Sequence, residues 1–278
     1  MFKNTPKIYA HISVINDKNY VLHDKILHRN GDIVEMFHRY CPHRMFPLHN
    51  IGDHVDNIKC EFHGFTWDKN GIPLNNNKKL KCGVATIGRS GLIFNNFIEP
   101  NHRWVDELSK ECNLIYSHCR QGKSVGSWLW LVDIEADYLH LTVPGVHPRL
   151  SQLIELADVN MDQGDGWVLQ EHTPGWWSLF VYPYTFIEHK AGCLSVNYVE
   201  PDNEQSEFGF TWITQFYYDP TISQDKRTEF ETLEDVFCED VAAIEKQKGG
   251  YFPLMKAINK NEYHCVHFGQ WWRDNKLT

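Results

Sequence analysis

The chain has 278 residues, enough for one large domain or two ordinary ones, and 42% of them are hydrophobic, which permits a substantial core. Its formal net charge of −9 argues against nucleic acid and anionic membrane surfaces as partners. No apolar run approaches the roughly 18 residues of a membrane-spanning helix, and the first residues lack the apolar stretch of a signal peptide. We therefore expect a cytoplasmic protein without a membrane span, in which the eight cysteines favour metal binding over disulfides.

The N-terminal third has the pattern of a small antiparallel β domain. Short β-prone runs at 8–15, 20–27 and 32–38 alternate with polar breaks. Asn70-Gly71 is a strong turn signal, and strand-like runs continue beyond it.

The later part of the chain mixes strands with helices. Residues 128–140 have the pattern of a strand that passes into a helix. Residues 223–248 form the longest helical pattern, with Ser223 as a plausible N-cap and Gly249 in the C-cap position. Three more runs have the pattern of strands, at 175–187, 193–199 and 208–218.

The residues Glu99-Pro100-Asn101 interrupt these patterns and mark a candidate domain boundary. They predict one domain at residues 1–98 and a second at 99–278. The first has the pattern of an all-β domain and the second that of an α+β domain. The fold class is therefore predicted to be α+β.

Two loops in the first domain each combine a cysteine with a histidine. Cys41 and His43 lie in one and Cys60 and His63 in the other, so the motif is C-x-H, sixteen intervening residues and C-x-x-H. Two thiolates and two neutral imidazoles can hold the two irons of a [2Fe–2S] cluster, and the imidazoles raise its potential. Zinc accepts the same ligands, but zinc fingers pair Cys with Cys and His with His along the chain. Four unrelated loop residues are the remaining alternative.

At these loops the sequence resembles the Rieske family. The resemblance includes Pro42, Arg44, Gly64 and the run from Phe65 to Gly71. Respiratory Rieske proteins carry an additional cysteine in each loop, and the matching positions here are Phe46 and Phe62. This difference favours the oxygenase and ferredoxin branch. Because a stand-alone Rieske ferredoxin needs only part of this length, the rest of the chain is expected to have a further function.

A second motif resembles the mononuclear iron site of Rieske oxygenases, in which an acidic residue precedes a His by three positions and a second His follows. The matching residues are Asp137, His140 and His147. Six residues separate the two histidines, where the family usually has four. Pro144-Gly145 between them is expected to end the helix and let the chain fold back. Ordinary core or surface histidines are the alternative.

A facial iron triad needs a carboxylate as well as two histidines. We expect Asp240, because it lies within the apolar stripe of the predicted helix, and a buried carboxylate needs a cation or strong donors. The adjacent Glu239 is expected on the opposite side of that helix. The Glu-Asp pair also resembles that of the oxidative-demethylase branch, where the Asp is the third iron ligand. A salt-bridged core Asp is the alternative. The stripe consists of Phe230, Leu233, Phe237, Val241 and Ile244.

The resemblance implies the terminal oxygenase component of a Rieske non-haem iron enzyme, with a helix-grip catalytic domain after the Rieske domain. Its cofactors would be a [2Fe–2S] cluster and Fe(II), and its electron donor a ferredoxin or flavin reductase. Its reaction would be the O2-dependent monohydroxylation or oxidative O- or N-demethylation of a small organic substrate. Ring cis-dihydroxylation, an electron carrier and an iron-less oxygenase relative remain alternatives.

The resemblance also gives Asp137 a role between subunits. In this family the acidic residue before the first iron His links the mononuclear site to a cluster His of the neighbouring subunit. Such a link implies a ring-shaped homotrimer. An Asp that only orients His140 within its own chain is the alternative.

Alternating aromatic residues give one predicted strand an aromatic face, which is more typical of a core than of a pocket. No Arg or Lys stands out there to bind a substrate carboxylate, and the sequence does not predict the substrate. The aromatic residues are Trp176, Phe180, Tyr182, Tyr184 and Phe186.

Overall fold

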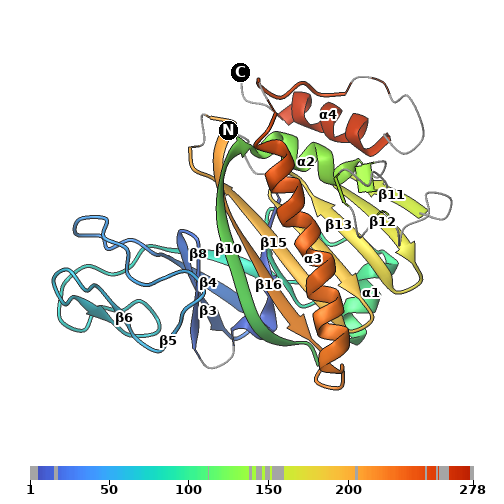
Figure 1. Cartoon of the computed structure of the whole chain (residues 1–278). Coiled ribbons are helices and arrows are strands. Elements are labelled where there is room, and N and C mark those ends of the chain that lie inside the picture. The colour runs from blue at the N-terminus through green and yellow to red at the C-terminus, as the bar shows by residue number, and fades with distance from the viewer. Residues whose placement is uncertain are drawn as a thin grey trace. The chain divides into compact units, whose positions relative to one another are not determined.

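The computed structural model divides into two compact units (Figure 1). One comprises Tyr9–His118, and the other comprises Cys119–Thr278 together with Met1–Ile8. In the part of the chain that the structure describes, no helix combines the length and apolar character needed to cross a bilayer. The structure describes residues 6–15, 18–111, 113–137, 140–141, 146–147, 151, 160–203, 206–247, 249–254, 256 and 263–275.

The first unit is built on a seven-stranded sheet with a separate two-stranded ladder. Its elements are β1 (Lys7–His11), the 3-10 helix η1 (Ile12–Val14), β2 (Asn19–Leu22), β3 (Lys25–Asn30), β4 (Ile33–His38), β5 (His54–Val55), β6 (Ile58–Lys59), β7 (Thr66–Trp67), β8 (Cys82–Ile87), β9 (Leu92–Asn95) and α1 (Arg103–Lys110). The large sheet has the order β1-β9-β8-β4-β3-β2-β5, and β6 pairs with β7. The antiparallel pairing of β2, β3 and β4 agrees with the strands predicted there.

The two Cys/His loops rest on the hydrophobic core of this unit. Cys41 and Cys60 are both buried and belong to the core themselves. Trp67, fully buried beside them, donates from Nε1 to the carbonyl of Lys78 at 2.6 Å. Both loops are therefore packed on this core through their cysteines. It consists of Val21, Ile26, Phe37, Cys41, Leu48, Ile58, Cys60, Trp67 and Leu80.

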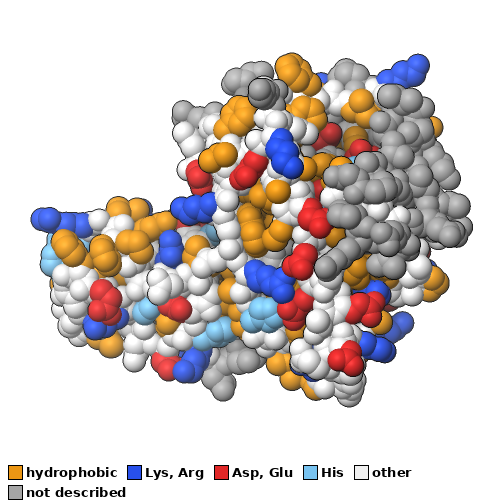
Figure 2. Space-filling model, in the orientation of Figure 1, with side chains coloured by type: hydrophobic (Ala, Val, Ile, Leu, Met, Phe, Trp, Pro, Cys, Tyr) orange, Lys and Arg blue, Asp and Glu red, His pale blue; other side chains and the backbone are white. Residues whose placement is uncertain are grey.

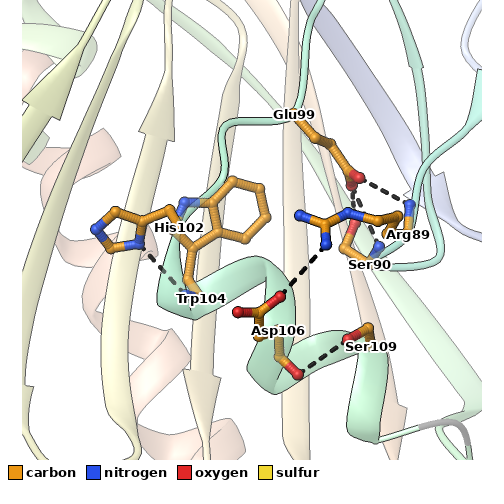
Figure 3. Close-up of polar contacts among 7 residues, drawn as sticks. All are labelled: Arg89, Ser90, Glu99, His102, Trp104, Asp106 and Ser109. Atoms are coloured by element: carbon orange, nitrogen blue, oxygen red, sulfur yellow. Dashed lines mark hydrogen bonds and ion pairs between the residues drawn. The ribbon is translucent and has the colours of Figure 1, made fainter.

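The segment after the predicted boundary is bound to the first unit (Figure 3). The Glu99 carboxylate accepts from the amides of Arg89, at 2.7 Å, and Ser90, at 3.3 Å, and also from the Ser90 hydroxyl. Arg89 reaches Asp106 of α1 at 3.5 Å. Trp104 of the same helix is buried. The two compact units are therefore divided between His118 and Cys119. The predicted domain bounds 1–98 and 99–278 stay a prediction about folding units.

Within the described residues, the second unit combines helices α2, α3 and α4 with another seven-stranded sheet. Its order is β10-β16-β15-β14-β13-β12-β11, and the neighbours from β11 to β16 pair antiparallel. The predicted α+β class, with the β-rich unit first, is confirmed. The elements are β10 (Ile115–Ser127), α2 (Trp128–Ala136), β11 (Asn160–Gly164), β12 (Trp167–Thr173), β13 (Trp176–Val181), β14 (Thr185–Lys190), β15 (Cys193–Pro201), β16 (Phe208–Tyr218), α3 (Gln224–Ile244) and α4 (Tyr263–Asn275).

Two local predictions in this unit were wrong. Residues 175–187 form parts of two strands, β13 and β14, which pair as a hairpin around Pro183. Proline has no amide to donate to a ladder, so it suits this turn and not a strand interior. The described part of 128–140 starts directly as helix α2, because Ser127 accepts from the amide of Trp130 at 3.5 Å and caps it.

Helix α3 lies along one face of the second sheet (Figure 1). Phe237 contacts the rings of Phe186 and Trp212, with centroids 5.9 and 5.5 Å apart. The predicted stripe of this helix therefore faces the sheet, and Ser223 occupies the predicted N-cap position without a side-chain capping bond.

A fork of ion pairs ties α3 to the edge strand β10. Arg120 reaches Glu231 at 2.7 Å and Asp235 at 2.8 Å, one helical turn apart. The guanidinium also lies 5.0 Å from the ring centre of Phe216. One strand residue thus holds two successive turns of the helix, which fixes the position of α3 along its own axis.

Glu99→Ala is expected to lower the free energy of unfolding by about 1–3 kcal/mol, because the amides of Arg89 and Ser90 lose their acceptor. The measurement is urea unfolding, followed by the visible absorption of the cluster. Asp56→Ala is the control, since its exposed ion pair with Lys18, at 3.1 Å, should contribute less than about 1 kcal/mol. Equal losses in the two variants would contradict the anchoring role of Glu99.

Candidate metal centres

The two Cys/His loops have the same backbone geometry. In the first, the amide of Cys41 donates to the carbonyl of Phe46 at 2.8 Å, and the amide of Met45 donates back to Cys41 at 2.9 Å. In the second, the amides of Cys60 and Gly64 make the equivalent bonds, both of 2.8 Å. Met45 and Gly64 have positive φ angles, 55° and 70°. The loops therefore present their cysteines equivalently, although the cysteine-to-histidine spacing differs.

The sulfur and nitrogen ligands of this loop pair differ in burial. The thiols of Cys41 and Cys60 are buried next to each other, and burial together with Cys60 raises the pKa of Cys41. The rings of His43 and His63 are exposed, with their Nδ1 atoms 3.2 Å apart. This donor set fits a [2Fe–2S] cluster whose inner iron has thiolate ligands and whose outer iron has imidazole ligands.

A single zinc ion fits these loops less well. Four ligands of one tetrahedral ion would place their donor atoms close together. Among the described residues, however, one group of three or more His, Cys, Asp or Glu has all its ligand atoms within 4.8 Å, and it lies elsewhere in the chain. The separate thiol and imidazole pairs favour a larger, two-iron group.

The rim of the loops is apolar and exposed. Phe46 and Phe62, which match the cysteine positions of the respiratory branch, stack with their ring centres 5.5 Å apart. They are 39% and 54% exposed, and Met45 beside them is 68% exposed. In Figure 2 hydrophobic, basic and histidine side chains lie together on the surface of the unit drawn in blue to cyan in Figure 1. An aromatic stack thus joins the loops at their surface.

The second candidate centre lies in the other unit and brings together His140, His147 and Asp240. Oδ1 of Asp240, on α3, lies 3.3 Å from Nε2 of His140 and 3.1 Å from Nε2 of His147. The two ring centres are 5.0 Å apart. The six-residue spacing is therefore compatible with one shared site. Pro144-Gly145, predicted to turn the chain, lies outside the described residues.

The donor atoms of this triad are better suited to binding a shared metal ion than to hydrogen bonds with one another. Asp240 is fully buried, and neither of its oxygens nor either Nε2 has a hydrogen-bond partner within the described ranges. Burial raises the pKa of Asp240, but the combined effect of His140 and His147 lowers it by more, so the net shift is downward. An ionised carboxylate and two imidazole nitrogens that meet in a buried space form the donor set of a facial Fe(II) triad.

The outer nitrogens of both imidazoles are oriented by this chain. Nδ1 of His140 bonds the backbone carbonyl of Asp137, and Nδ1 of His147 lies 2.8 Å from Oε2 of Glu239. Burial lowers the pKa of His147, but Asp240 and Glu239 raise it, and the net shift is upward. Each ring therefore directs its Nε2 into the triad, as partners of metal-bound histidines do.

Glu239 was predicted on the side of the helix opposite Asp240, but its side chain reaches the site. Its backbone position differs by about 100° from that of Asp240. The longer glutamate side chain nevertheless reaches the far nitrogen of His147 while remaining 38% exposed. The adjacent Glu-Asp in the sequence was the signal that could have identified it, because neighbouring carboxylates can contact the two nitrogens of one imidazole.

A pocket opens beside the triad. It is lined by Leu141, which follows His140, and by Val236 and Phe237, one helical turn before Asp240. It contains about 610 Å³ of space, including its opening to solvent. Its lining combines apolar and polar side chains, as small-molecule sites do.

The aromatic strand face expected to be core divides between core and pocket. Trp176, Phe180 and Phe186 line the pocket. Tyr182 instead contacts Phe268 of α4, and it is fully buried. Phe180 and Phe186 are also buried among the core residues, so these side chains are core and pocket wall at once.

The comparisons with known proteins agree with this arrangement. Residues 6–85 match the Rieske [2Fe–2S] domain family. No curated protein matches the chain by sequence. Three solved structures resemble it in fold. The quaternary ammonium Rieske monooxygenase CntA in complex with L-carnitine has a TM-score of 0.70 at 17% identity, over 97% of this chain and 92% of that chain. NdmA of Pseudomonas putida CBB5 has 0.57 at 15%, over 97% and 89%. Apo dicamba monooxygenase has 0.55 at 14%, over 99% and 97%.

The family match covers the segment with both Cys/His loops, and the fold similarity extends over nearly the whole chain. The resemblance seen at the Cys/His loops is thereby confirmed: residues 6–85 are a Rieske [2Fe–2S] domain, and nearly the whole chain shares its fold with the Rieske monooxygenase CntA, with NdmA and with dicamba monooxygenase.

Proposed function

We propose that this chain is the terminal oxygenase component of a Rieske enzyme, catalysing monohydroxylation or oxidative O- or N-demethylation of a small organic substrate. The observation that carries the proposal is the presence of two separate donor sets in one chain. Cys41, Cys60, His43 and His63 would hold the [2Fe–2S] cluster. The buried triad described above would hold a single Fe(II).

The triad separates this function from that of an electron carrier. A carrier needs only the cluster loops, whereas His140, His147 and Asp240 converge in a buried space beside a pocket. Iron bound there would supply O2 activation, because a facial triad leaves coordination positions open. The chain itself would orient both imidazoles and provide the walls that confine the substrate.

The cluster loops suggest how electrons enter. His43 and His63 lie at the surface, and the basic side chains of Arg44 and Lys78 contribute to the lowered pKa of His43, after burial and His63. A ferredoxin or flavin reductase with an acidic docking surface would complement this edge. The docking surface of the proposed donor is thus acidic, whereas the net charge of −9 taken alone would favour a basic docking surface.

The test begins with iron analysis of anaerobically purified protein. About three irons per chain are expected, two in the cluster and one at the triad, and about two would indicate an electron carrier. Iron-loaded protein is then incubated with a metabolite mixture, O2 and a surrogate reductase. A hydroxylated or demethylated product supports the proposal, and cis-diol formation would favour ring dihydroxylation.

The reduced protein is expected to show the rhombic EPR signal of a mixed Cys/His cluster, because the added electron localises on the imidazole-ligated iron. His63→Cys should lower the reduction potential, since a thiolate replaces a neutral ligand. The potential is measured by redox titration of the visible absorption. A colourless protein that holds a single zinc would contradict the cluster assignment.

Asp240→Ala is expected to lose the mononuclear iron and retain the cluster absorption. Glu239→Ala should weaken iron binding about 10–100-fold, because His147 loses the partner that orients it. Both effects are measured by anaerobic Fe(II) titration. Glu229→Ala, which removes an exposed carboxylate of the same helix, serves as the control. An unchanged iron affinity in the Glu239 variant would show that its contact with His147 is incidental.

Asp137 is proposed to link the triad to a cluster His of a neighbouring subunit in a homotrimer. Asp137→Asn keeps the side-chain volume and the carbonyl that accepts from His140, so both metals should stay bound. A pre-reduced cluster is then expected to stay reduced when O2 and the substrate found in the metabolite screen are added. Stopped-flow absorption measures this in a single turnover. Rapid cluster reoxidation coupled to product, or activity as a monomer, would refute the link.

A further inference from the structure

One glutamine of the second sheet is buried in the wall of the pocket beside the triad. Gln170 lies near the middle of β12, opposite Ser178 of β13, and both residues line the pocket. Gln170 is only 1% exposed, although glutamine is ordinarily a surface residue. Burying an amide costs free energy unless its polar atoms are hydrogen-bonded, so the partners of this side chain decide what it does.

The nitrogen of this amide is bound to helix α2. Nε2 of Gln170 lies 3.4 Å from the carbonyl oxygen of Ala136, the last residue of α2. Carbonyls in the last turn of a helix have no partner within the helix, so a donor from outside suits this one. Because a carbonyl only accepts hydrogen bonds, the amide must turn its nitrogen toward Ala136. The orientation of the Gln170 amide is thereby fixed.

The oxygen of the same amide remains available to a ligand. Among the residues that the structure describes, none donates a hydrogen bond to Oε1 of Gln170. An acceptor that is buried without a donor is unfavourable, and a ligand that brings a donor removes this cost. An amide oxygen accepts from an N–H or O–H group and gives no hydrogen bond to a molecule that lacks one.

The contact with α2 also fixes where this oxygen lies in the chain of interactions that leads to the triad. Ala136 directly precedes Asp137, whose carbonyl bonds Nδ1 of His140. The amide of Asp137 donates to two carbonyls of α2, at 3.0 and 3.1 Å. Because a peptide unit is planar, the unit that joins Ala136 to Asp137 is held on both sides, by the helix and by Gln170. A ligand bonded to Gln170 is therefore referred to rigid backbone.

Much of the remaining wall is apolar. Phe180 and Phe186 meet edge to face with their ring centres 5.5 Å apart, and the ring centre of Phe237 lies 5.9 Å from that of Phe186. All three residues line the pocket. Aromatic walls pack favourably on other flat apolar groups, in offset or edge-to-face contacts. The pocket therefore combines an apolar wall with one oriented acceptor.

We propose that this pocket selects molecules that combine an apolar body with an N–H or O–H group, and that Oε1 of Gln170 accepts this group. The inference rests on the proposed function, because the molecule it describes is the substrate of that reaction. The phenylalanine wall holds the apolar body, and the carbonyl of Ala136 orients the amide that recognises the donor. Hydrocarbons, ethers and thioethers of the same shape are expected to bind less tightly.

Binding of indole and of benzothiophene, in which sulfur replaces the N–H group, tests the proposal. Calorimetry on the anaerobic, iron-loaded protein, without reductase or O2, measures both affinities. Indole is expected to bind about tenfold more tightly, because benzothiophene leaves the buried acceptor without a donor. In Gln170→Met, which keeps an unbranched side chain and removes the acceptor, that preference should disappear while the affinity for benzothiophene stays unchanged.

Gln170→Glu separates recognition of the ligand from the contact with α2. A glutamate keeps an oxygen at this place, so the preference for indole should remain even where the bond to Ala136 weakens. Gln163→Met is the matched control, because it makes the same change at an exposed position of the neighbouring strand β11. It should retain the full preference for indole.

Five results would each overturn the inference. They are equal affinities for the two probes in the parent protein, no binding of either, a preference for indole that survives in Gln170→Met, loss of benzothiophene binding in that variant, and loss of the preference in Gln170→Glu or Gln163→Met. None of these results bears on the oxygenase proposal, which depends on iron content and O2-dependent turnover.

Discussion

The second unit depends on one constraint, which is a carboxylate buried completely between two imidazoles. Burying an ionised group costs free energy unless charge and ligands compensate it. Asp240 meets that condition only while α3 keeps both its rotation and its axial position against the sheet. The aromatic contacts of Phe237 set the rotation, and the fork from Arg120 to Glu231 and Asp235 sets the axial position.

The two candidate centres differ in which of their ligands are exposed to solvent. In the cluster loops the thiols are buried and the imidazoles exposed, so that one side of the group is insulated and the other can meet a redox partner. In the triad every donor atom is buried, and the adjacent pocket gives a small molecule a way in. Under the proposed function, electrons would enter at the exposed imidazoles of the first unit and substrate at the pocket of the second.

The sequence was sufficient for the ligand candidates and insufficient for their surroundings. The Cys/His loops and Asp240 could be predicted because ligand chemistry restricts residue type and spacing. The role of Glu239 was missed, although its position next to Asp240 was a usable signal, because a helical wheel gives the direction of a backbone position and omits the reach of a long side chain. The hairpin at Pro183 was missed because two strands of similar composition adjoin it. The predicted boundary after residue 98 stays a prediction about folding units, and the sequence pattern did not show that Glu99 accepts hydrogen bonds from Arg89 and Ser90.

Helix α3 carries a triad carboxylate, the partner of His147 and part of the pocket wall, all within a little more than one turn. A single-residue insertion or deletion between Asp235 and Glu239 would rotate this group by about 100° and move it by about 1.5 Å relative to the Arg120 fork. Substitutions along the exposed face leave that spacing intact, whereas a change of length in this interval does not. We therefore expect relatives with a working site to keep the number of residues between Asp235 and Asp240, and to vary in length outside this interval.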